Sequence, residues 1–508
     1  MNQALASDKS TQYRTGKRFD WEPILDDDSF NSYSLSLCSQ YLRDQPSLSS
    51  RGVNREQKRA KIEQIFLQIL SALYTSSNHI GEQSDNNNCI AIPRTRRAYT
   101  TKQDGSEKVL GSHSYTVSIV DWLLSRNMLE EQLGNEIKGY SRYRAFGDLK
   151  EYLDGIGFIW MPVKPIAREQ LIIVRDKDTK TKDSFRVPLV SNDKIEEELD
   201  QLETINACLR RHCFSLHLSN DNLRQIVATS NHGRLDNQSP HINFYQTQIV
   251  RIYARGQTYK GGRFYRGWWQ HVPSYVRQYI LIDGNNTAEI DYSGMSMRLL
   301  YASEGVELDL NTDVYNLGFD DWAGETDPRR PIIKTYVNAV FNDENETYRV
   351  SPKDLKLLGV SNQQELRDKL YKVHDRVNLR DRIKSGWGLE SQYLDSEIAL
   401  QLMHQFAIHD DPLLPVHDSF ITERDNVLYL KQLMLDTFER VARGKARVDI
   451  TYSLPNEAFG RNKKPIHPTM YGRREIIEAL KIINERPITH SLMTNYLESW
   501  KKDYCEEK

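Results

Sequence analysis

Residues 279–298 read YILIDGNNTAEIDYSGMSMR and combine several strong local signals. Two short apolar runs, 279–282 and 288–290, flank Asp-Gly-Asn-Asn, which is typical of a hairpin turn. The second strand is predicted to end at Asp291, and a helix is predicted to follow it. Asp291 is therefore expected at a strand end just before a helix, where a carboxylate can reach into a cleft.

A similar pattern returns at residues 413–421, which read LLPVHDSFI. It follows a predicted helix that ends near Asp410, and it indicates a hairpin with His417 and Asp418 at its apex. Two carboxylates from separate strands, brought side by side, can hold two divalent ions. Hard oxygen ligands suit Mg²⁺, with Mn²⁺ as an alternative. The sequence therefore predicts a metal site formed by Asp291 and Asp418.

A helix that carries positive charge is predicted between these two hairpins. Residues 327–338 read DPRRPIIKTYVN, and in a helix Arg330, Lys334 and Asn338 lie four residues apart on one face. Two cations one turn apart suit a triphosphate, and the helix N-terminus adds its own attraction for anions.

The stretch before the first hairpin, residues 237–282, contains no Asp or Glu, although 27% of the whole chain is charged. Guanidinium groups neutralise phosphates and flat rings stack on bases, so the pattern favours contact with nucleic acid. The alternative is an aromatic core from which arginines reach the surface. The basic residues are Arg251, Arg255, Lys260, Arg263, Arg266 and Arg277, and the aromatic residues are Phe244, Tyr245, Tyr253, Tyr259, Phe264, Tyr265, Trp268, Trp269, Tyr275 and Tyr279.

The order of these signals resembles the palm and fingers of the family A DNA polymerases and of the related phage-type single-subunit RNA polymerases. Residues 291–298 match the DNA enzymes' Asp-Tyr-Ser-Gln-Ile-Glu-Leu-Arg motif at its first three places and its last. Residues 313–315, Asp-Val-Tyr, resemble the Asp-Ile-His element that follows. Residues 416–420 carry the His-Asp-Ser of the RNA polymerases, and residues 261–265 resemble their Arg-Gly-Arg-x-Tyr segment. The resemblance covers roughly residues 240–450.

What the resemblance implies is a set of roles for individual residues. Asp291 and Asp418 would bind the metals, and Lys334 would take part in the chemistry. The residues expected to bind the nucleotide are Arg330, Lys334, Ser296 and Tyr292. The residues expected to contact nucleic acid are Arg255, Arg263, Tyr265, Arg298 and His417.

Three departures from the family pattern bear on the substrate. DNA enzymes place a Glu five residues after the first catalytic Asp, where its bulk excludes a ribose 2′-hydroxyl; this chain has Ser296, which favours tolerance of ribonucleotides. Both families place a Tyr eight residues after the Lys, and this chain has Asn342, which leaves sugar selection open. The intervals are short, with 43 residues from Asp291 to Lys334 and 84 from Lys334 to Asp418, so the fingers are expected to be small.

The predicted fold class is α+β, mainly helical, with an antiparallel palm sheet of polymerase type. Residues 1–55 are polar and are expected to form a flexible arm. Residues 56–200 are expected to form an N-terminal α+β domain whose helix, helix and hairpin layout resembles a winged helix, or else a small support domain. Residues 201–455 would form the palm and small fingers, and residues 456–508 a C-terminal extension without assigned chemistry.

Composition limits the class of protein and the compartment in which it is expected. The net charge of −2 excludes a globally basic nucleic-acid coat, and no apolar run approaches the roughly 18 residues of a membrane span. Five scattered cysteines argue against a disulfide framework and favour a reducing, cytoplasmic compartment. Cys208 and Cys213, with four residues between them and no second pair, make a poor zinc site.

Together these observations predict a nucleotidyltransferase that adds nucleoside triphosphates to a 3′-hydroxyl by a two-metal mechanism. Its partners would be primer and template nucleic acid, and the small residue at 296 favours an RNA-polymerase-like enzyme. Two alternatives stay open. One is a template-independent nucleotidyltransferase, and the other is a non-catalytic nucleic-acid-binding protein of replication or regulation with a vestigial palm.

Overall fold

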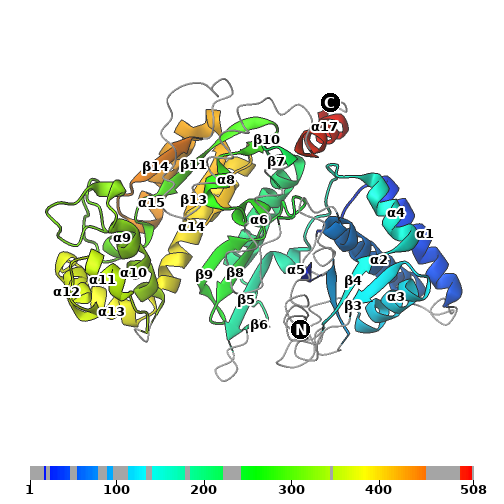
Figure 1. The fold of residues 1–508 in the computed structure, drawn as a ribbon, viewed down its shortest axis with the longest axis horizontal. Coiled ribbons are helices and arrows are strands. Elements are labelled where there is room, and N and C mark those ends of the chain that lie inside the picture. Colours follow the sequence, from blue (N-terminus) through cyan, green and yellow to red (C-terminus); the bar gives the residue numbers. More distant parts are fainter. Residues whose placement is uncertain are drawn as a thin grey trace, which may run out of the picture.

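The computed structural model describes residues 17–18, 23–45, 54–77, 89–94, 112–132, 140–177, 184–220, 223, 242–343, 347–452 and 492–505. Helices and largely antiparallel sheets are combined, in agreement with the predicted α+β class. Helices α1–α4 lie at one end of the molecule and α9–α13 at the other, with two sheets between them (Figure 1). Among the described helices, none has the length and apolar character needed to cross a membrane.

The N-terminal unit packs four helices around a sheet of strand order β1-β2-β4-β3. Its elements are β1 (Lys17–Arg18), α1 (Asp28–Asp44), α2 (Arg55–Ser77), β2 (Ile90–Pro93), α3 (His113–Ser125), β3 (Leu129–Gln132), β4 (Tyr140–Ala145) and α4 (Gly147–Ile156).

Helix α1 lies inside the segment that was expected to be a flexible arm, and for residues 28–44 that expectation is wrong. Asp27 caps the helix by accepting the backbone N–H of Phe30 at 2.8 Å. Phe30, Leu37 and Tyr41 are buried against the rest of the unit. The apolar residues are spaced along a polar segment, so the composition of the segment concealed its buried face. Residues 1–16 and 46–53 of the expected arm lie outside the described residues.

A second sheet has the strand order β6-β5-β8-β9. Its strands are β5 (Ile172–Lys177), β6 (Ser184–Val187), β8 (Val250–Ala254) and β9 (Gln257–Tyr265). The predicted β5–β6 hairpin exists, but β5 also pairs in parallel with β8. The hairpin therefore belongs to a sheet shared with the basic stretch, and the winged-helix layout is wrong. Helices α5 (Arg168–Leu171) and α6 (Asp193–Arg211) flank this region.

The central sheet has the order β12-β13-β11-β10-β7, with β14 paired to the free side of β11. Its strands are β7 (Phe214–Leu216), β10 (Ile280–Ile282), β11 (Asn285–Tyr292), β12 (Leu414–Val416), β13 (Ser419–Glu423) and β14 (Val448–Tyr452). Both predicted hairpins are present with two-residue turns. Asp283 and Gly284 have φ of +53° and +85°, as a type I′ turn requires, and His417 has φ of +59°.

Long helices cover one face of this sheet. They are α14 (Trp387–Ala407) and α15 (Val427–Ala442), and the shorter α9 (Met295–Ser303) packs against both. Ala288, Ile290 and Tyr292 are buried on that side, and the Tyr292 hydroxyl donates to the backbone oxygen of Met434 in α15 at 2.7 Å. Because side chains alternate along a strand, Asp291 lies on the opposite face.

The far end of the molecule is a group of short helices that includes the predicted cationic helix (Figure 1). They are η4 (Gly324–Thr326), α10 (Arg330–Asn342), α11 (Pro352–Leu357), α12 (Gln363–Val373) and α13 (Leu379–Lys384). The remaining short elements are η3 (Trp268–Gln270), α8 (Ser274–Arg277) and η5 (Arg424–Asn426).

The chain returns to the central sheet in α17 (Leu492–Cys505), which contacts β7. The indole N–H of Trp500 donates to the backbone oxygen of Arg211 at 3.1 Å, and Ser499 accepts the backbone N–H of Trp160 at 2.7 Å. This part of the expected C-terminal extension therefore joins the central sheet to the N-terminal unit. Residues 456–491 lie outside the described residues.

A buried histidine joins α12 to the segment that faces α10. His374 Nε2 lies 3.1 Å from the backbone oxygen of Val314, and Nδ1 lies 2.9 Å from the hydroxyl of Tyr301 in α9. The carbonyl can only accept, so Nε2 carries the proton and Nδ1 accepts from Tyr301. Burial lowers the pKa of His374 to about 4.

We expect His374 to make the fold sensitive to acid. Its neutral form contributes stability above pH 6.5, and that contribution is lost as the pH falls from 6.5 towards 4, because only the unfolded chain gains the proton. In His374→Gln the free energy of unfolding should fall less on acidification than in the wild type, by up to about 3 kcal/mol. Urea unfolding at pH 7 and pH 4.5 measures it. The exposed His409→Gln variant should behave like the wild type, and an unchanged loss in His374→Gln would contradict the assignment.

Candidate active site

The two predicted metal-binding carboxylates meet at one end of the central sheet. Asp291 near the end of β11 is paired with Ser419, the first residue of β13. Asp418 is the turn residue immediately before it, and its backbone oxygen accepts the N–H of Tyr292 at 3.2 Å. The fold thus brings Asp291, which lies far from Asp418 in the sequence, to the end of the sheet where Asp418 forms the adjoining turn.

The charge of Lys334 acts on Asp291. Burial and the neighbouring charge of Asp418 raise the pKa of Asp291 well above its usual range, while the Lys334 ammonium opposes that shift. Lys334 is exposed on α10 and forms no ion pair with any described residue. Its charge is therefore available to a ligand that binds at the two carboxylates.

A third carboxylate, Asp449, was not found by sequence reasoning. It lies on β14 directly opposite Asp291, and its charge adds to the raised pKa of that residue. Arg447 Nε donates to Asp449 Oδ1 at 3.2 Å. The only local signal is the alternation of Val448, Asp449 and Ile450, which is typical of a strand with one polar face.

Glu289 shares the face of Asp291 but is already engaged. Its carboxylate accepts two bonds from Arg277, at 2.9 and 2.8 Å, and one from the Ser419 hydroxyl at 2.7 Å. Such a bidentate pair holds a carboxylate firmly in place. Glu289 therefore supports the sheet next to the candidate metal ligands.

The Asp313-Val314-Tyr315 segment positions Arg330. Asp313 accepts from Arg330 Nε at 3.0 Å and from the indole N–H of Trp322 at 3.1 Å. The Arg330 guanidinium also lies 5.1 Å from the centre of the Tyr315 ring. The segment and the cationic helix, singled out separately in the sequence, are thus parts of one arrangement.

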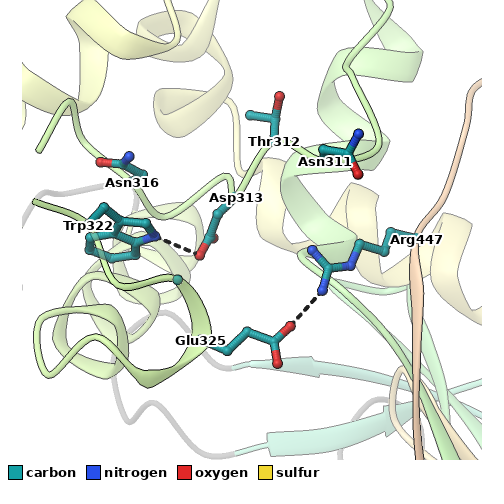
Figure 2. Close-up of a pocket in the computed structure, with 8 residues that line it drawn as sticks. Asn311, Thr312, Asp313, Asn316, Trp322, Glu325 and Arg447 are labelled. Carbon is teal, nitrogen blue, oxygen red and sulfur yellow. Dashed lines mark hydrogen bonds and ion pairs between the residues drawn. The ribbon is translucent and has the colours of Figure 1, made fainter. Parts of the chain in front are cut away.

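An open hollow of about 560 Å³ adjoins this arrangement (Figure 2). Asp313 and Trp322 lie on one side of it, and Arg447 reaches across to Glu325 with a 2.7 Å ion pair. Its volume is in the range of small-molecule sites. The lining residues are Asn311, Thr312, Asp313, Asn316, Trp322, Gly324, Glu325 and Arg447.

Arg263 is bound to a buried carboxylate rather than open to solvent. Its guanidinium donates to Asp395 of α14 at 2.9 Å. Burial raises the pKa of Asp395 to about 6; Arg263 opposes this shift and Asp418 adds to it. Arg263 therefore lies near the candidate metal ligands, and a direct contact with nucleic acid would compete with Asp395.

Other arginines of the acid-free stretch pair with acids that lie outside it. Arg251 is completely buried and pairs with Glu198 at 3.2 Å and Glu397 at 2.6 Å, and Arg277 pairs with Glu289. The lack of local acids therefore reflects long-range pairing at these positions.

Most of the aromatic rings of the stretch are core residues, so for them the stacking hypothesis is wrong. The buried rings are Phe244, Tyr245, Tyr253, Phe264, Trp268, Trp269 and Tyr279. The Trp269 indole donates to the backbone oxygen of Pro415 at 3.1 Å, which supports the hairpin of Asp418. Among the described rings, Tyr259 and Tyr265 remain exposed, with 57% and 37% of their surface accessible.

Two residues of the first motif have structural positions instead of the expected ligand contacts. Tyr292 is buried beneath the sheet. Arg298 is also buried, and its guanidinium donates to the backbone oxygens of Ser293, Leu310 and Thr312 at 3.0 to 3.2 Å. The expected nucleotide contact of Tyr292 and nucleic-acid contact of Arg298 are therefore wrong.

His417, Tyr265 and Arg255 keep positions compatible with a contact to nucleic acid. His417 is exposed at the turn beside Asp418, and its ring centre lies 6.4 Å from that of Tyr265. The surrounding protein and the charge of Arg263 lower the pKa of His417, which favours a neutral ring at pH 7. Arg255 is exposed at the β8–β9 turn.

The two positions that bear on sugar selection lie at helix ends. Ser296 is half-buried at the start of α9, and its backbone oxygen accepts the indole N–H of Trp387 at 3.2 Å. Asn342 ends α10, where Gln392 donates to its side-chain oxygen at 3.3 Å. Gly388 lets this amide approach α14, because an added Cβ would lie 2.3 Å from the oxygen.

No protein-family model matches this chain, and no curated protein is similar to it in sequence. Among solved structures, a similar one is the POL domain of Pol1 from M. smegmatis in complex with DNA primer-template and dNTP. The similarity has a TM-score of 0.26 and 16% sequence identity, and covers 51% of this chain and 52% of that chain. It thus spans about half of each chain and is too weak to support an inference.

We expect Asp291→Asn to raise the thermal stability of the metal-free protein at pH 7 by a few degrees. A carboxyl with a raised pKa costs stability once the pH exceeds its unfolded value, and the amide removes that cost. Thermal unfolding in EDTA measures it. Added Mg²⁺ should raise the melting temperature of the wild type and of the exposed control Asp425→Asn, but not that of Asp291→Asn. An equal Mg²⁺ response in all three would refute the site.

Proposed function

We propose that the protein is a polymerase-type nucleotidyltransferase that adds nucleoside triphosphates to a 3′-hydroxyl. The observation that carries the proposal is the meeting of Asp291 on β11 with Asp418 in the adjoining β12–β13 turn, where the charge of Lys334 acts on Asp291. In this proposal β11, β13 and β14 form the palm, and the short helices around α10 form small fingers.

The residues at the site fit a divalent cation. Carboxylate oxygens are hard donors. Burial penalises the charge of Asp291, and the neighbouring charges of Asp418 and Asp449 add to that penalty. Asp291 and Asp418 would hold Mg²⁺, with Mn²⁺ as an alternative, and Asp449 stands beside them. Such ions stabilise the attacking and leaving oxygens in phosphoryl transfer.

The cations of α10 would hold the triphosphate. Lys334 projects from the helix one turn after Arg330, so both can reach one chain of phosphates. The bond from Arg330 to Asp313 uses Nε, and a phosphate would be bound through the two terminal nitrogens. Lys334 would add positive charge, or a proton, at the leaving pyrophosphate.

The proposed substrates include ribonucleotides. Ser296 is too small to exclude a 2′-hydroxyl as a Glu at that position would, and Asn342 replaces the expected ring at the end of α10. The proposal therefore favours an RNA-polymerase-like or ribonucleotide-tolerant enzyme that works on a primed template.

The test is an incorporation assay with a 5′-labelled primer, with and without template, with each nucleotide set and with Mg²⁺ or Mn²⁺. We expect template-dependent extension with ribonucleotides. Asp418→Asn should reduce incorporation by at least about 100-fold, because it removes charge from the metal site, while primer binding stays intact. Asp425→Asn, an exposed change downstream on the same segment, is the matched control.

Each other outcome of the assay would support a different function. Extension limited to deoxynucleotides would assign sugar selection to a residue other than Ser296. Extension without template would identify a template-independent transferase. A primer that is bound but never extended by the wild type would exclude catalysis and favour the nucleic-acid-binding protein.

Tyr265 is the exposed ring best placed to stack on a base near the primer end, because it lies beside His417. Stacking of this kind contributes about 1–3 kcal/mol per base. We therefore expect Tyr265→Ala to weaken primer–template binding by roughly 5- to 150-fold in fluorescence anisotropy. Tyr429→Ala, which changes another exposed tyrosine, on α15, should leave binding unchanged. Equal affinities for the two variants would exclude the stacking role.

A further inference from the structure

Three potential metal ligands meet at the other end of the central sheet, away from Asp291. They are Cys208 in the last turns of α6, His212 just after that helix, and Asp410 after α14. One ligand atom from each lies within 4.8 Å of the others. Cys208 and His212 are four residues apart and therefore lie on one side of the helix end.

The surroundings of His212 match those of a metal-ligating histidine. Its Nδ1 lies 2.6 Å from Oδ2 of Asp283, whose other oxygen accepts the backbone N–H of Cys213 at 2.7 Å. Its Nε2 is buried without a hydrogen-bond partner and lies 3.6 Å from Asp410. A carboxylate bound to the far nitrogen is the usual support of a histidine that binds metal.

Asp410 is held in a comparable way. Arg211 Nε donates to its Oδ1 at 2.9 Å, and ligating carboxylates are generally fixed by such outer hydrogen bonds. Asp410 also has φ of +59°, the left-handed conformation that commonly ends a helix, and it follows the end of α14.

We propose that Cys208, His212 and Asp410 bind one Zn²⁺, with water in the fourth position. Thiolate, imidazole and carboxylate are the donors that zinc takes at about 2.0–2.3 Å, whereas Mg²⁺ and Ca²⁺ prefer oxygen alone. In this proposal the second ligand beside the Cys208 thiolate is His212, four residues later, and not Cys213. The backbone N–H of Cys213 donates to Asp283.

The site lies where three segments of the chain meet. Strand β11 begins two residues after Asp283, and β12 begins four residues after Asp410. The ion would therefore join the end of α6 to the starts of the two hairpin strands that lead to Asp291 and Asp418. The zinc proposal stands independently of the proposed polymerase chemistry.

The competing arrangement is a metal-free ion-pair network. Without a metal, the bond to Asp283 and the proximity of Cys208 outweigh burial and raise the pKa of His212 to about 10. The charged groups that face the ring are Asp283, Asp410, Glu423 and, through Asp410, Arg211. Zinc binding would displace the proton of His212 and that of Cys208.

Metal content decides between the two arrangements. The full-length protein is stripped with a chelator, reloaded with Zn²⁺, freed of excess metal and analysed by mass spectrometry. We expect about one zinc per chain, reduced at least about tenfold in Cys208→Ser. The buried thiol variant Cys38→Ser is the matched control and should keep its zinc. Asp418→Asn should also keep it, which separates this site from the proposed magnesium site.

Cobalt gives an independent signature, because a thiolate bound to Co²⁺ produces a charge-transfer absorption band. The band should appear in the wild type and in Cys38→Ser and be absent from Cys208→Ser. If Cys208→Ser does not fold by circular dichroism, the exposed ligand variant Asp410→Asn replaces it, with at least about tenfold weaker zinc binding expected. No stoichiometric zinc and no cobalt band in the wild type would overturn the proposal.

Discussion

The pairing of β11 on both of its sides is the constraint on which the rest of the arrangement depends. With β13 on one side and β14 on the other, the strand cannot slip without breaking two ladders. A shift by one residue would turn Ile290 towards the solvent side and Asp291 towards the helices. The free-energy cost of exposing an apolar side chain and burying a carboxylate keeps the register unique. The carboxylate is therefore presented by the same backbone bonds that hold the sheet together, and α10 needs only to approach that face.

Much of this region could be predicted from short patterns, because each depends on neighbouring residues. Asp283 and Gly284 specify their turn, and the spacing of Arg330 and Lys334 specifies a helical face. Buried roles were harder to predict. Nothing near Arg298 in the sequence indicates that three backbone oxygens surround it, and nothing near Arg251 indicates Glu198 or Glu397. The partners of Arg298 are backbone oxygens, which no residue type marks, and Glu397 lies 146 residues after Arg251, so neither environment leaves a local signal.

The acid-free stretch illustrates how composition can mislead. Its rings and arginines suggested a surface for nucleic acid, yet the rings of Trp268 and Trp269 are buried, and Arg251 and Arg263 are paired with acids of other elements. The carboxylates that pair with these arginines lie on α6 and α14. The stretch therefore connects these helices to the sheets through ion pairs. The exposed residues of the stretch include Arg255 at the β8–β9 turn and, at the other end of that hairpin, Tyr265 beside the turn of His417.

The late position of β14 has a consequence for biosynthesis. Asp291 leaves the ribosome 158 residues before its partner Asp449, which is about 8–30 s of translation at ordinary rates. During that time one edge of β11 has no strand to pair with, and an open edge is a template for unwanted association. A nascent chain that pauses in this interval would be a natural client for chaperones, and truncation before residue 448 would leave that edge permanently open.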